Sequence, residues 1–177
     1  STVMGFNVNN EANGDKVGGL VGYMNSGAGK LDGNTVKNTK ISGYRDVAGL
    51  AGAVATTNTV TNNKVENVEI TYSNAHVGKI VSTKTAVTVD ETNTATNVTI
   101  TRVIIAYTVA ELNEALSALS GDALNTDAVL QNCDEPSGVV KILGDYTGTL
   151  TLKDSAVASV QAAGAADLVI VGNVAVK

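Results

Sequence analysis

The sequence contains no tryptophan, and its 177 residues include only one phenylalanine, one proline, one cysteine and one histidine. Aromatic residues make up 3% of the chain but hydrophobic residues 44%, so the core must consist of Val, Ile, Leu and Ala. Together with abundant Thr, this mixture favours strands, because β-branched side chains fit a pleated sheet. The single Cys133 excludes a framework of internal disulfides.

Charge and hydropathy narrow the class of protein further. The net charge is −5 and the basic residues form no stripe, so neither nucleic-acid binding nor a polybasic membrane anchor is expected. The longest apolar runs, such as 168–171, are too short for a membrane-spanning segment. The chain opens partway through a repeating pattern, so we expect a mature or trimmed part of a longer protein.

A repeat with a step of 30 residues is the main feature that is present. The stretch VGGLVG at 17–22 recurs as VAGLAG at 47–52 and, altered, as VGKIVS at 77–82. A second element follows the same rhythm, as VKNTKI at 36–41, VENVEI at 65–70 and ATNVTI at 95–100. Between the first and the second element, each copy has one more recurring apolar residue, which we call its apolar mark: Leu31, Val60 and Val89.

Each repeat reads as two or three short strands that cannot bury their apolar side chains alone. Stacking the repeats in parallel would bury them, with Val17, Val47 and Val77 in one column and Ile41, Ile70 and Ile100 in another. This predicts a mainly β fold of the β-solenoid or right-handed parallel β-helix kind. The equivalent residues Asn38, Asn67 and Asn97 are expected at turns or in amide ladders, and Asn93 in a turn.

The repeated GLVG and GLAG tetrapeptides at 19–22 and 49–52, each followed by an Asn-containing strand pattern, resemble the GLUG motif. That motif occurs in tandem in bacterial surface proteins, including adhesins and peptidase-associated proteins. The resemblance covers about residues 1–102, and the third copy departs from it at Lys79 and Ser82. It implies a β-helical repeat on a secreted or cell-surface protein and transfers no catalytic residue.

The pattern changes after the array, which gives two expected domains, 1–106 and 107–177. Thr108 and Glu111 form a capping box, and apolar residues follow at helical spacing, so we predict a helix over about 108–120 that stops at Gly121. Residues 123–138 read as irregular, with a turn of helix at 128–130. Strands are predicted at 139–143, 149–152 and 168–176.

This order of a short helix followed by strands is similar to the opening of right-handed parallel β-helix domains, over about residues 107–177. In those domains the helix covers the apolar end of the stack. An uncovered end exposes apolar side chains and unpaired strand edges, so we expect a covering role here. The sequence leaves open whether the helix closes the first array or opens a second one.

The candidate catalytic residues are more consistent with structural roles. His76 stands where the other copies have Lys16 and Asp46, at a variable polar turn, and there is no second histidine to complete a zinc site. Cys133 lies among acidic residues, which disfavour a thiolate, so a structural thiol is expected. We therefore predict no catalytic, cofactor-binding or metal-binding residues.

Other polar groups lack the spacing that a binding site would need, or have an equally good structural explanation. Asp127, Asp134 and Glu135 form one acidic group and Asp90 with Glu91 another, but neither has the spacing of a calcium loop. The stretch 27–30 lacks the full spacing of a phosphate loop. Three tyrosines could stack on sugars or cap strand ends: Tyr23, Tyr44 and Tyr72. A column of threonines for ice binding is interrupted at Lys40 and Glu69.

The expected function is therefore a non-catalytic adhesion or scaffold module, secreted or on the bacterial cell surface, that binds a glycan or protein partner. The alternative is a carbohydrate-active parallel β-helix enzyme, a polysaccharide lyase or hydrolase. Such an enzyme would need acidic or basic residues lined up along one face, and the repeats show no such column. The sequence does not identify the ligand, the oligomeric state or calcium binding.

Overall fold

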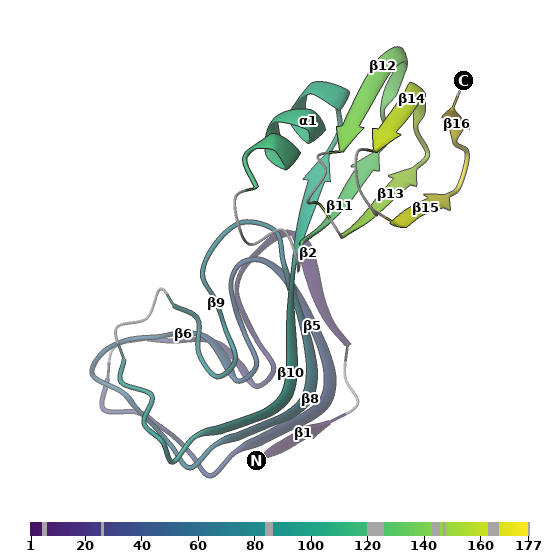
Figure 1. The fold of residues 1–177 in the computed structure, drawn as a ribbon. Helices are drawn as coiled ribbons and strands as arrows, with labels where there is room; N and C mark the ends of the chain where they lie inside the picture. Colours follow the sequence, from purple (N-terminus) through teal and green to yellow (C-terminus); the bar gives the residue numbers. More distant parts are fainter. Residues whose placement is uncertain are drawn as a thin grey trace. The chain divides into compact units, whose positions relative to one another are not determined.

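The protein is mainly β, with parallel sheets and, among the residues described, one helix. The computed structural model describes residues 1–4, 7–25, 27–83, 87–119, 126–142, 146, 148–162 and 167–176. The chain divides into two compact units, Ser1–Thr101 and Arg102–Lys177, and strand β10 (Thr94–Ala106) passes from one to the other. Figure 1 follows the chain through both units.

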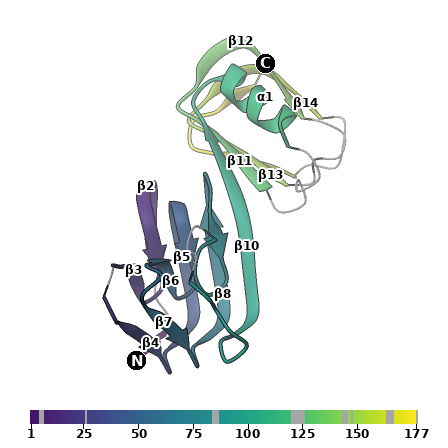
Figure 2. The ribbon, with the colours of Figure 1, turned by 90° about the vertical axis from the view of Figure 1, so that its left-hand side faces the viewer.

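The first unit consists of parallel strands in successive copies of the repeat. Its other strands are β1 (Thr2–Met4), β2 (Asn7–Gly18), β3 (Val21–Met24), β4 (Lys30–Asp32), β5 (Thr35–Ala48), β6 (Ala51–Val54), β7 (Thr59–Thr61), β8 (Lys64–Tyr72) and β9 (Val77–Gly78). In the largest sheet β5 pairs with β1 and β2 on one side and with β8 and β9 on the other, and β10 follows β8. Strands β3 with β6, and β4 with β7, form two smaller sheets (Figure 2).

The register of these strands matches the repeat in the sequence. Val17 is paired with Val47 and Val47 with Val77, as predicted. Ile41 is paired with Ile70, also as predicted, and Ile100 packs, partly buried, against the same core cluster. The three apolar marks are in register too, because β4 and β7 align Leu31 with Val60, and a single bridge aligns Val60 with Val89.

The alternation of buried and exposed side chains along β5 and β8 explains the core of this unit. Val65, Val68 and Ile70 are buried, while the residues between them face outward. Glycine is required where neighbouring copies meet closely: a Cβ on Gly52 would lie 2.3 Å from the carbonyl carbon of Lys16 and 2.7 Å from the oxygen of Asp46. The sequence motif that carries Gly22 and Gly52 therefore reflects contact between backbones of successive copies.

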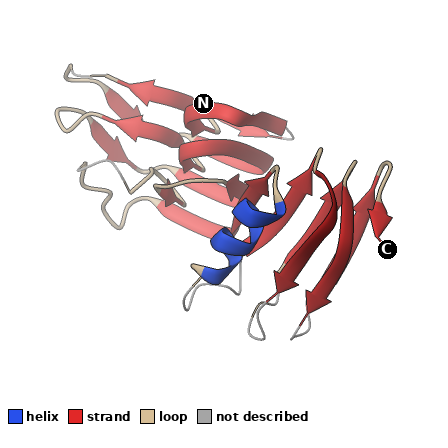
Figure 3. Ribbon diagram, turned by 90° about the horizontal axis from the view of Figure 1, so that it is seen from above, coloured by secondary structure: helices blue, strands red, loops and turns tan. Residues whose placement is uncertain are grey.

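The second unit contains the helix and two parallel sheets. Its elements after β10 are α1 (Val109–Ser117), β11 (Thr126–Gln131), β12 (Asp134–Ile142), β13 (Thr149–Lys153), β14 (Ala156–Ala162), β15 (Asp167–Val171) and β16 (Ala175–Val176). Strand β11 pairs with the 102–106 part of β10 and with β13, which pairs with β15. The second sheet has the order β12-β14-β16 (Figure 1). Figure 3 shows the helix in blue among the strands in red.

The predicted helix is present and begins as the capping box requires. Thr108 is the N-cap, its side chain accepts a hydrogen bond from the Glu111 amide, and the Glu111 carboxylate accepts from the Thr108 amide. The helix ends at Ser117, three residues before the predicted end at 120; residue 120 and Gly121 lie outside the described residues. Val109, Leu112 and Leu116 point into the core of the second unit.

The helix lies against β12, so it belongs to the second unit. The side-chain amide of Asn113 donates to the Val139 carbonyl over 2.9 Å, and its oxygen accepts from the Lys141 amide over 2.8 Å. These two groups flank Val140, as the partners of a residue in a parallel neighbouring strand would. Asn113 thus makes the two hydrogen bonds that a residue of a parallel neighbouring strand would make to this edge of β12.

Two predicted features of the second unit are wrong. Residues 126–131 form strand β11 and not a turn of helix at 128–130, because Thr126, Ala128 and Leu130 are buried on one side. The predicted strand over 168–176 is interrupted after β15, where Gly172 has a φ of +74°, and only β16 resumes it. The predicted strand over 139–143 lies within β12, which starts earlier; residue 143 lies outside the described residues.

Candidate functional site

The outer face of β5, β8 and the 94–101 part of β10 forms a regular polar surface on the first unit. We call it the polar face, and its members are Lys37, Asn38, Lys40, Ser42, Glu66, Asn67, Glu69, Thr71, Thr96, Asn97 and Thr99. The strand register places Lys37 beside Glu66, Lys40 beside Glu69 and Ser42 beside Thr71. Every position of this face is exposed or half-buried.

An amide ladder runs across the polar face, as predicted. Nδ2 of Asn67 donates to Oδ1 of Asn38 over 3.2 Å, and Nδ2 of Asn97 donates to Oδ1 of Asn67 over 3.0 Å. All three residues have left-handed backbones, with φ between 52° and 54°. All three lie within strands, and asparagine is one of the few residues that adopts a left-handed backbone readily, so this backbone and the ladder together explain its recurrence.

The remaining members of the polar face also bond between copies. Lys40 Nζ lies 2.7 Å from Glu69 Oε2, and Thr71 Oγ1 donates to Ser42 Oγ over 2.6 Å. Both ends of the ion pair are well exposed, so it adds little stability and remains available to a ligand. The third copy carries Thr96 and Thr99 in place of charged residues, so the face is charged over β5 and β8 and hydroxylic over β10.

His76 lies in one column with Lys16 and Asp46, the residues at the same position of the other two copies, as their 30-residue spacing indicates. The three residues have φ values of 59°, 60° and 54°. Nδ1 of His76 lies 2.9 Å from Oδ1 of Asp46, whose side chain is fully buried. This pair is not visible in the sequence, because the two residues are 30 positions apart and differ in type. A buried carboxylate needs such a polar partner, which gives His76 a structural role.

Charged residues next to this column also pair between copies. The guanidinium of Arg45 bonds to both carboxylate oxygens of Asp15, at 2.7 and 2.6 Å, and this pairing raises the pKa of Arg45. Lys16 Nζ lies 5.2 Å from the centre of the Tyr23 ring, and Asn74 Nδ2 donates to the Tyr44 hydroxyl. Tyr23 is the exposed member of the three predicted tyrosines, whereas Tyr72 packs against the core cluster.

A buried asparagine ladder was not predicted. Asn34 donates through its amide nitrogen and its Nδ2 to Oδ1 of Asn63, and Asn63 donates in the same two ways to Oδ1 of Asn93. The signal in the sequence is an asparagine three or four residues after each of the apolar marks at 31, 60 and 89. Asn93 lies at the end of a turn, as predicted, where its backbone amide donates to the Asp90 carbonyl, and it is also a member of this ladder.

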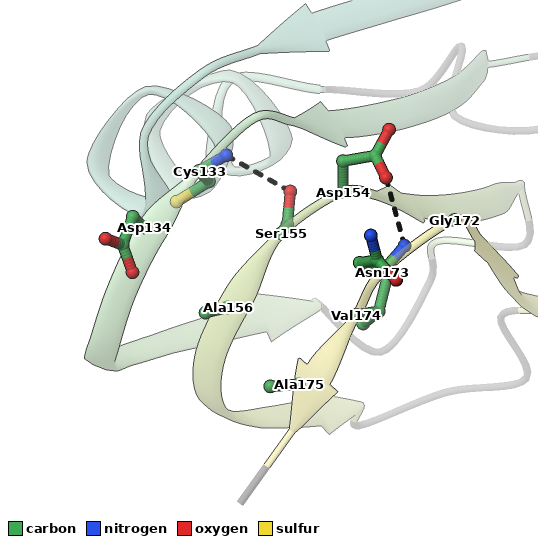
Figure 4. A pocket seen from close by; sticks show the side chains of 9 residues that line it. All are labelled: Cys133, Asp134, Asp154, Ser155, Ala156, Gly172, Asn173, Val174 and Ala175. Atoms are coloured by element: carbon green, nitrogen blue, oxygen red, sulfur yellow. Dashed lines mark hydrogen bonds between the residues drawn. The ribbon is translucent and has the colours of Figure 1, made fainter.

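A hollow of about 450 Å³ lies beside Cys133 in the second unit. Figure 4 shows the residues that line it. Its lining includes Cys133, Asp134, Asp154, Ser155 and Asn173. The Cys133 amide donates to Ser155 Oγ over 3.2 Å, and the Asn173 amide donates to Asp154 Oδ1 over 3.0 Å. Both bonds join neighbouring turns, and the side chains of Asp134, Asp154 and Asn173 are exposed at the hollow.

Cys133 takes the place of the ladder asparagine of the first unit, because it follows Asn132, with a φ of 52°, as Asn63 follows Asn62, with a φ of 55°. Its side chain is buried, and burial, followed by the charge of Glu135, raises the pKa of the thiol. A raised pKa keeps the thiol protonated and unreactive near neutral pH. The structural role predicted for Cys133 agrees with this environment.

Carboxylates of both predicted acidic groups accept hydrogen bonds from backbone amides. Asp127 Oδ1 accepts from the Thr149 amide over 2.9 Å, and Glu135 Oε2 accepts from the Val109 amide over 3.3 Å. Asp90 Oδ1 accepts from Thr92 and from Asn93 Nδ2 beside a second hollow, of about 300 Å³, that Thr56 and Thr88 also line. No group of three His, Cys, Asp or Glu side chains suited to a metal ion occurs among the described residues.

Two further predictions concern motifs and membrane spans. Lys30 starts strand β4, so the stretch 27–30 does not precede a helix as a phosphate loop does. In the part of the chain that the structure describes, no helix has the length and apolar character needed to cross a membrane.

A comparison of the chain with protein-family models, curated proteins and solved structures finds no match.

Proposed function

We propose that the chain is a non-catalytic adhesion or scaffold module of a secreted or cell-surface bacterial protein, and that its polar face binds a glycan or protein partner. We further propose that its first unit is a β-solenoid of GLUG-like repeats. The observation that carries the proposal is the polar face itself. Its ladder and ion pair hold the side chains in register and leave them accessible.

The chemistry of this face suits recognition better than catalysis. Amides, hydroxyls and one exposed ion pair offer many donors and acceptors on a rigid support, which favours specific contacts at low cost in conformational entropy. General acid–base catalysis instead needs groups with tuned pKa values in a pocket. The secreted, bacterial setting rests on the resemblance of the repeats at 17–22 and 47–52 to the GLUG motif.

An array of glycans and surface proteins, probed with the purified chain, tests the proposal. Thr99→Arg places a bulky cation on the polar face, and Thr83→Arg makes the same change at an exposed threonine outside it. We expect at least one ligand whose affinity falls tenfold or more with Thr99→Arg and stays unchanged with Thr83→Arg.

Two results would overturn the proposal. One is that no ligand binds in a way that depends on the polar face. The other is reproducible depolymerisation of a polysaccharide, with or without calcium, that is lost when one carboxylate or lysine is replaced; this would favour the lyase or hydrolase alternative.

A further inference from the structure

The hollow of about 300 Å³ in the first unit lies between the second and the third copy of the repeat. Strand β7 and the residues just before it line one side, and residues 87, 88 and 90 line the other. We call it the threonine hollow, because Thr56, Thr59, Thr61 and Thr88 all belong to its lining. The lining shares no residue with the polar face, so this is a separate surface of the same unit.

The threonine hollow lies where the segments that lead to the apolar marks become shorter from copy to copy. In each copy this segment joins two positions that are aligned with those of the neighbouring copies, and it is one residue shorter than in the copy before. The aligned ends are Val21 and Leu31, Ala51 and Val60, and Val81 and Val89. The third copy therefore has the fewest residues with which to cover this part of the second.

The first two copies are bonded to each other at this place. Thr57 Oγ1 accepts from the Gly27 amide over 3.1 Å and donates to the Gly27 carbonyl over 3.0 Å, and Asn58 Oδ1 accepts from the Gly29 amide over 3.0 Å. In the third copy Val87 stands where Asn58 does, two residues before the apolar mark. The side chain of a valine cannot form such hydrogen bonds, and here the hollow separates the two copies.

The lining combines an apolar side with hydroxyl groups. Val60 and Val87 supply the apolar side. Thr56, Thr59 and Thr88 are exposed, and their hydroxyls form no hydrogen bond with any residue that the structure describes. Binding pockets for small molecules have volumes from about 300 Å³ upward and combine apolar walls with a few polar groups, so the hollow has the size and the lining of a small one.

Asp90 is the one charged residue among the described residues of this lining. Its Oδ1 accepts from the amide and the hydroxyl of Thr92 and from Asn93 Nδ2, and these bonds hold the carboxylate in place. Oδ2 forms no hydrogen bond within the described part of the chain, so it is an acceptor for a ligand. Hydrogen bonds from hydroxyl groups to a carboxylate are strong, and a carboxylate that is already fixed loses little conformational entropy on binding.

We propose that the threonine hollow binds one uncharged sugar ring. A sugar ring has C–H groups, which fit against the two valines, and a rim of hydroxyls, which fit the threonine hydroxyls and the Asp90 carboxylate. The carboxylate of a uronic acid would be repelled by Asp90, so the hollow discriminates against acidic sugars. This site goes beyond the function proposed for the polar face and does not depend on it.

Matched pairs of sugars test the ligand class. Ligand-observed NMR with the full chain measures dissociation constants for glucose, galactose and mannose, each beside its uronic acid. We expect at least one of the three neutral sugars to bind, and to bind at least about tenfold more tightly than the uronic acid derived from it.

Three variants locate the binding. Thr88→Arg places a long side chain in the hollow and should weaken binding of the neutral sugar by about tenfold or more. Thr99→Arg makes the same change at an exposed threonine of the polar face and should leave this binding unchanged. Asp90→Asn removes the charge at nearly constant shape, so it should largely remove the preference over the uronic acid. Circular dichroism checks that all three variants fold.

Three results would overturn the proposal. One is that none of the neutral sugars binds, and another is that the uronic acids bind equally well. The third is that binding is lost with Thr99→Arg and kept with Thr88→Arg; this would place the sugar on the polar face and support the function proposed for that face. Binding that only Thr88→Arg weakens supports the threonine hollow whether or not the array finds a ligand, so failure of the two proposals is distinguishable.

Discussion

Asn34 donates a hydrogen bond from Nδ2 to Oδ1 of Asn63 over 2.9 Å, and both side chains are buried. The side-chain Nδ2 of Asn63 in turn donates to the Leu31 carbonyl over 2.9 Å, so the ladder ties side chains to the backbone of the preceding copy. Buried polar groups of this kind stabilise only while every member keeps its partner.

Replacing the middle member should therefore be costly. Asn63→Ala leaves the buried Nδ2 of Asn34 without its acceptor, and we expect the free energy of unfolding to fall by roughly 2–4 kcal/mol. Asn67→Gly is the matched control in the exposed ladder, because glycine keeps the left-handed backbone; it should cost less than about 1 kcal/mol. Urea melts of both variants measure the difference, and equal losses would contradict a special role for the buried ladder.

The apolar column gives a second prediction. Ile70 is buried between neighbouring copies, so Ile70→Ala should lower the free energy of unfolding by roughly 2–5 kcal/mol through lost burial and the cavity left behind. Ile100→Ala makes the same change at a partly buried isoleucine of the next copy and should cost less. Denaturant midpoints compare them, and the reverse order would count against the stacked core.

The first turn of α1 gives a third prediction. Thr108→Ala removes the side-chain acceptor of the Glu111 amide and should cost about 1 kcal/mol, whereas Thr108→Ser should cost little. Leu112→Asp places a carboxylate in the core of the second unit and should be far more damaging, with association visible in light scattering. Stable, monomeric Leu112→Asp protein would show that the helix does not protect this core.

Glu111 gives a pH dependence. Backbone hydrogen bonds, first from the Tyr107 amide, lower its pKa below the usual 4.5. A carboxyl with a lowered folded-state pKa stabilises the fold above the unfolded value, and this contribution is lost as pH falls through the folded value. The stability difference between the unaltered chain and Glu111→Gln should therefore shrink below pH 4.5. Melts from pH 7 to pH 3 measure it, and a difference that grows on acidification would contradict the assignment.

The parts of the fold that the sequence predicted are those in which one residue type recurs at fixed spacing. Val17, Val47 and Val77 repeat because each occupies the same core position, and Thr108 with Glu111 marks a local helix start. Such signals depend on neighbours in sequence or on strict periodicity, so they are visible without the fold.

The features that the sequence did not predict depend on contacts between residues whose types differ from copy to copy, or on burial that the sequence pattern does not reveal. Asp46 and His76 form a pair although neither resembles the other or Lys16, their equivalent in the first copy. Strand β11 was missed because Val129 lies on its outer side and obscures the alternation of Ala128 and Leu130. Asn113 looks like an ordinary polar residue of a helix until β12 is placed beside it.

The register of the first unit has a consequence for how such a chain can change in length. Deleting Thr35–Asn63 joins Asn34 to Lys64, so that Asn34 takes the place of Asn63 ahead of β8 and Leu31 that of Val60. In the register with β2, Ile70 then takes the place of Ile41 and Val77 that of Val47, although Asp15 loses its ion pair with Arg45. Tandem duplication or loss of one whole repeat by recombination therefore conserves the pairing of the core columns, whereas an insertion within a strand shifts its register.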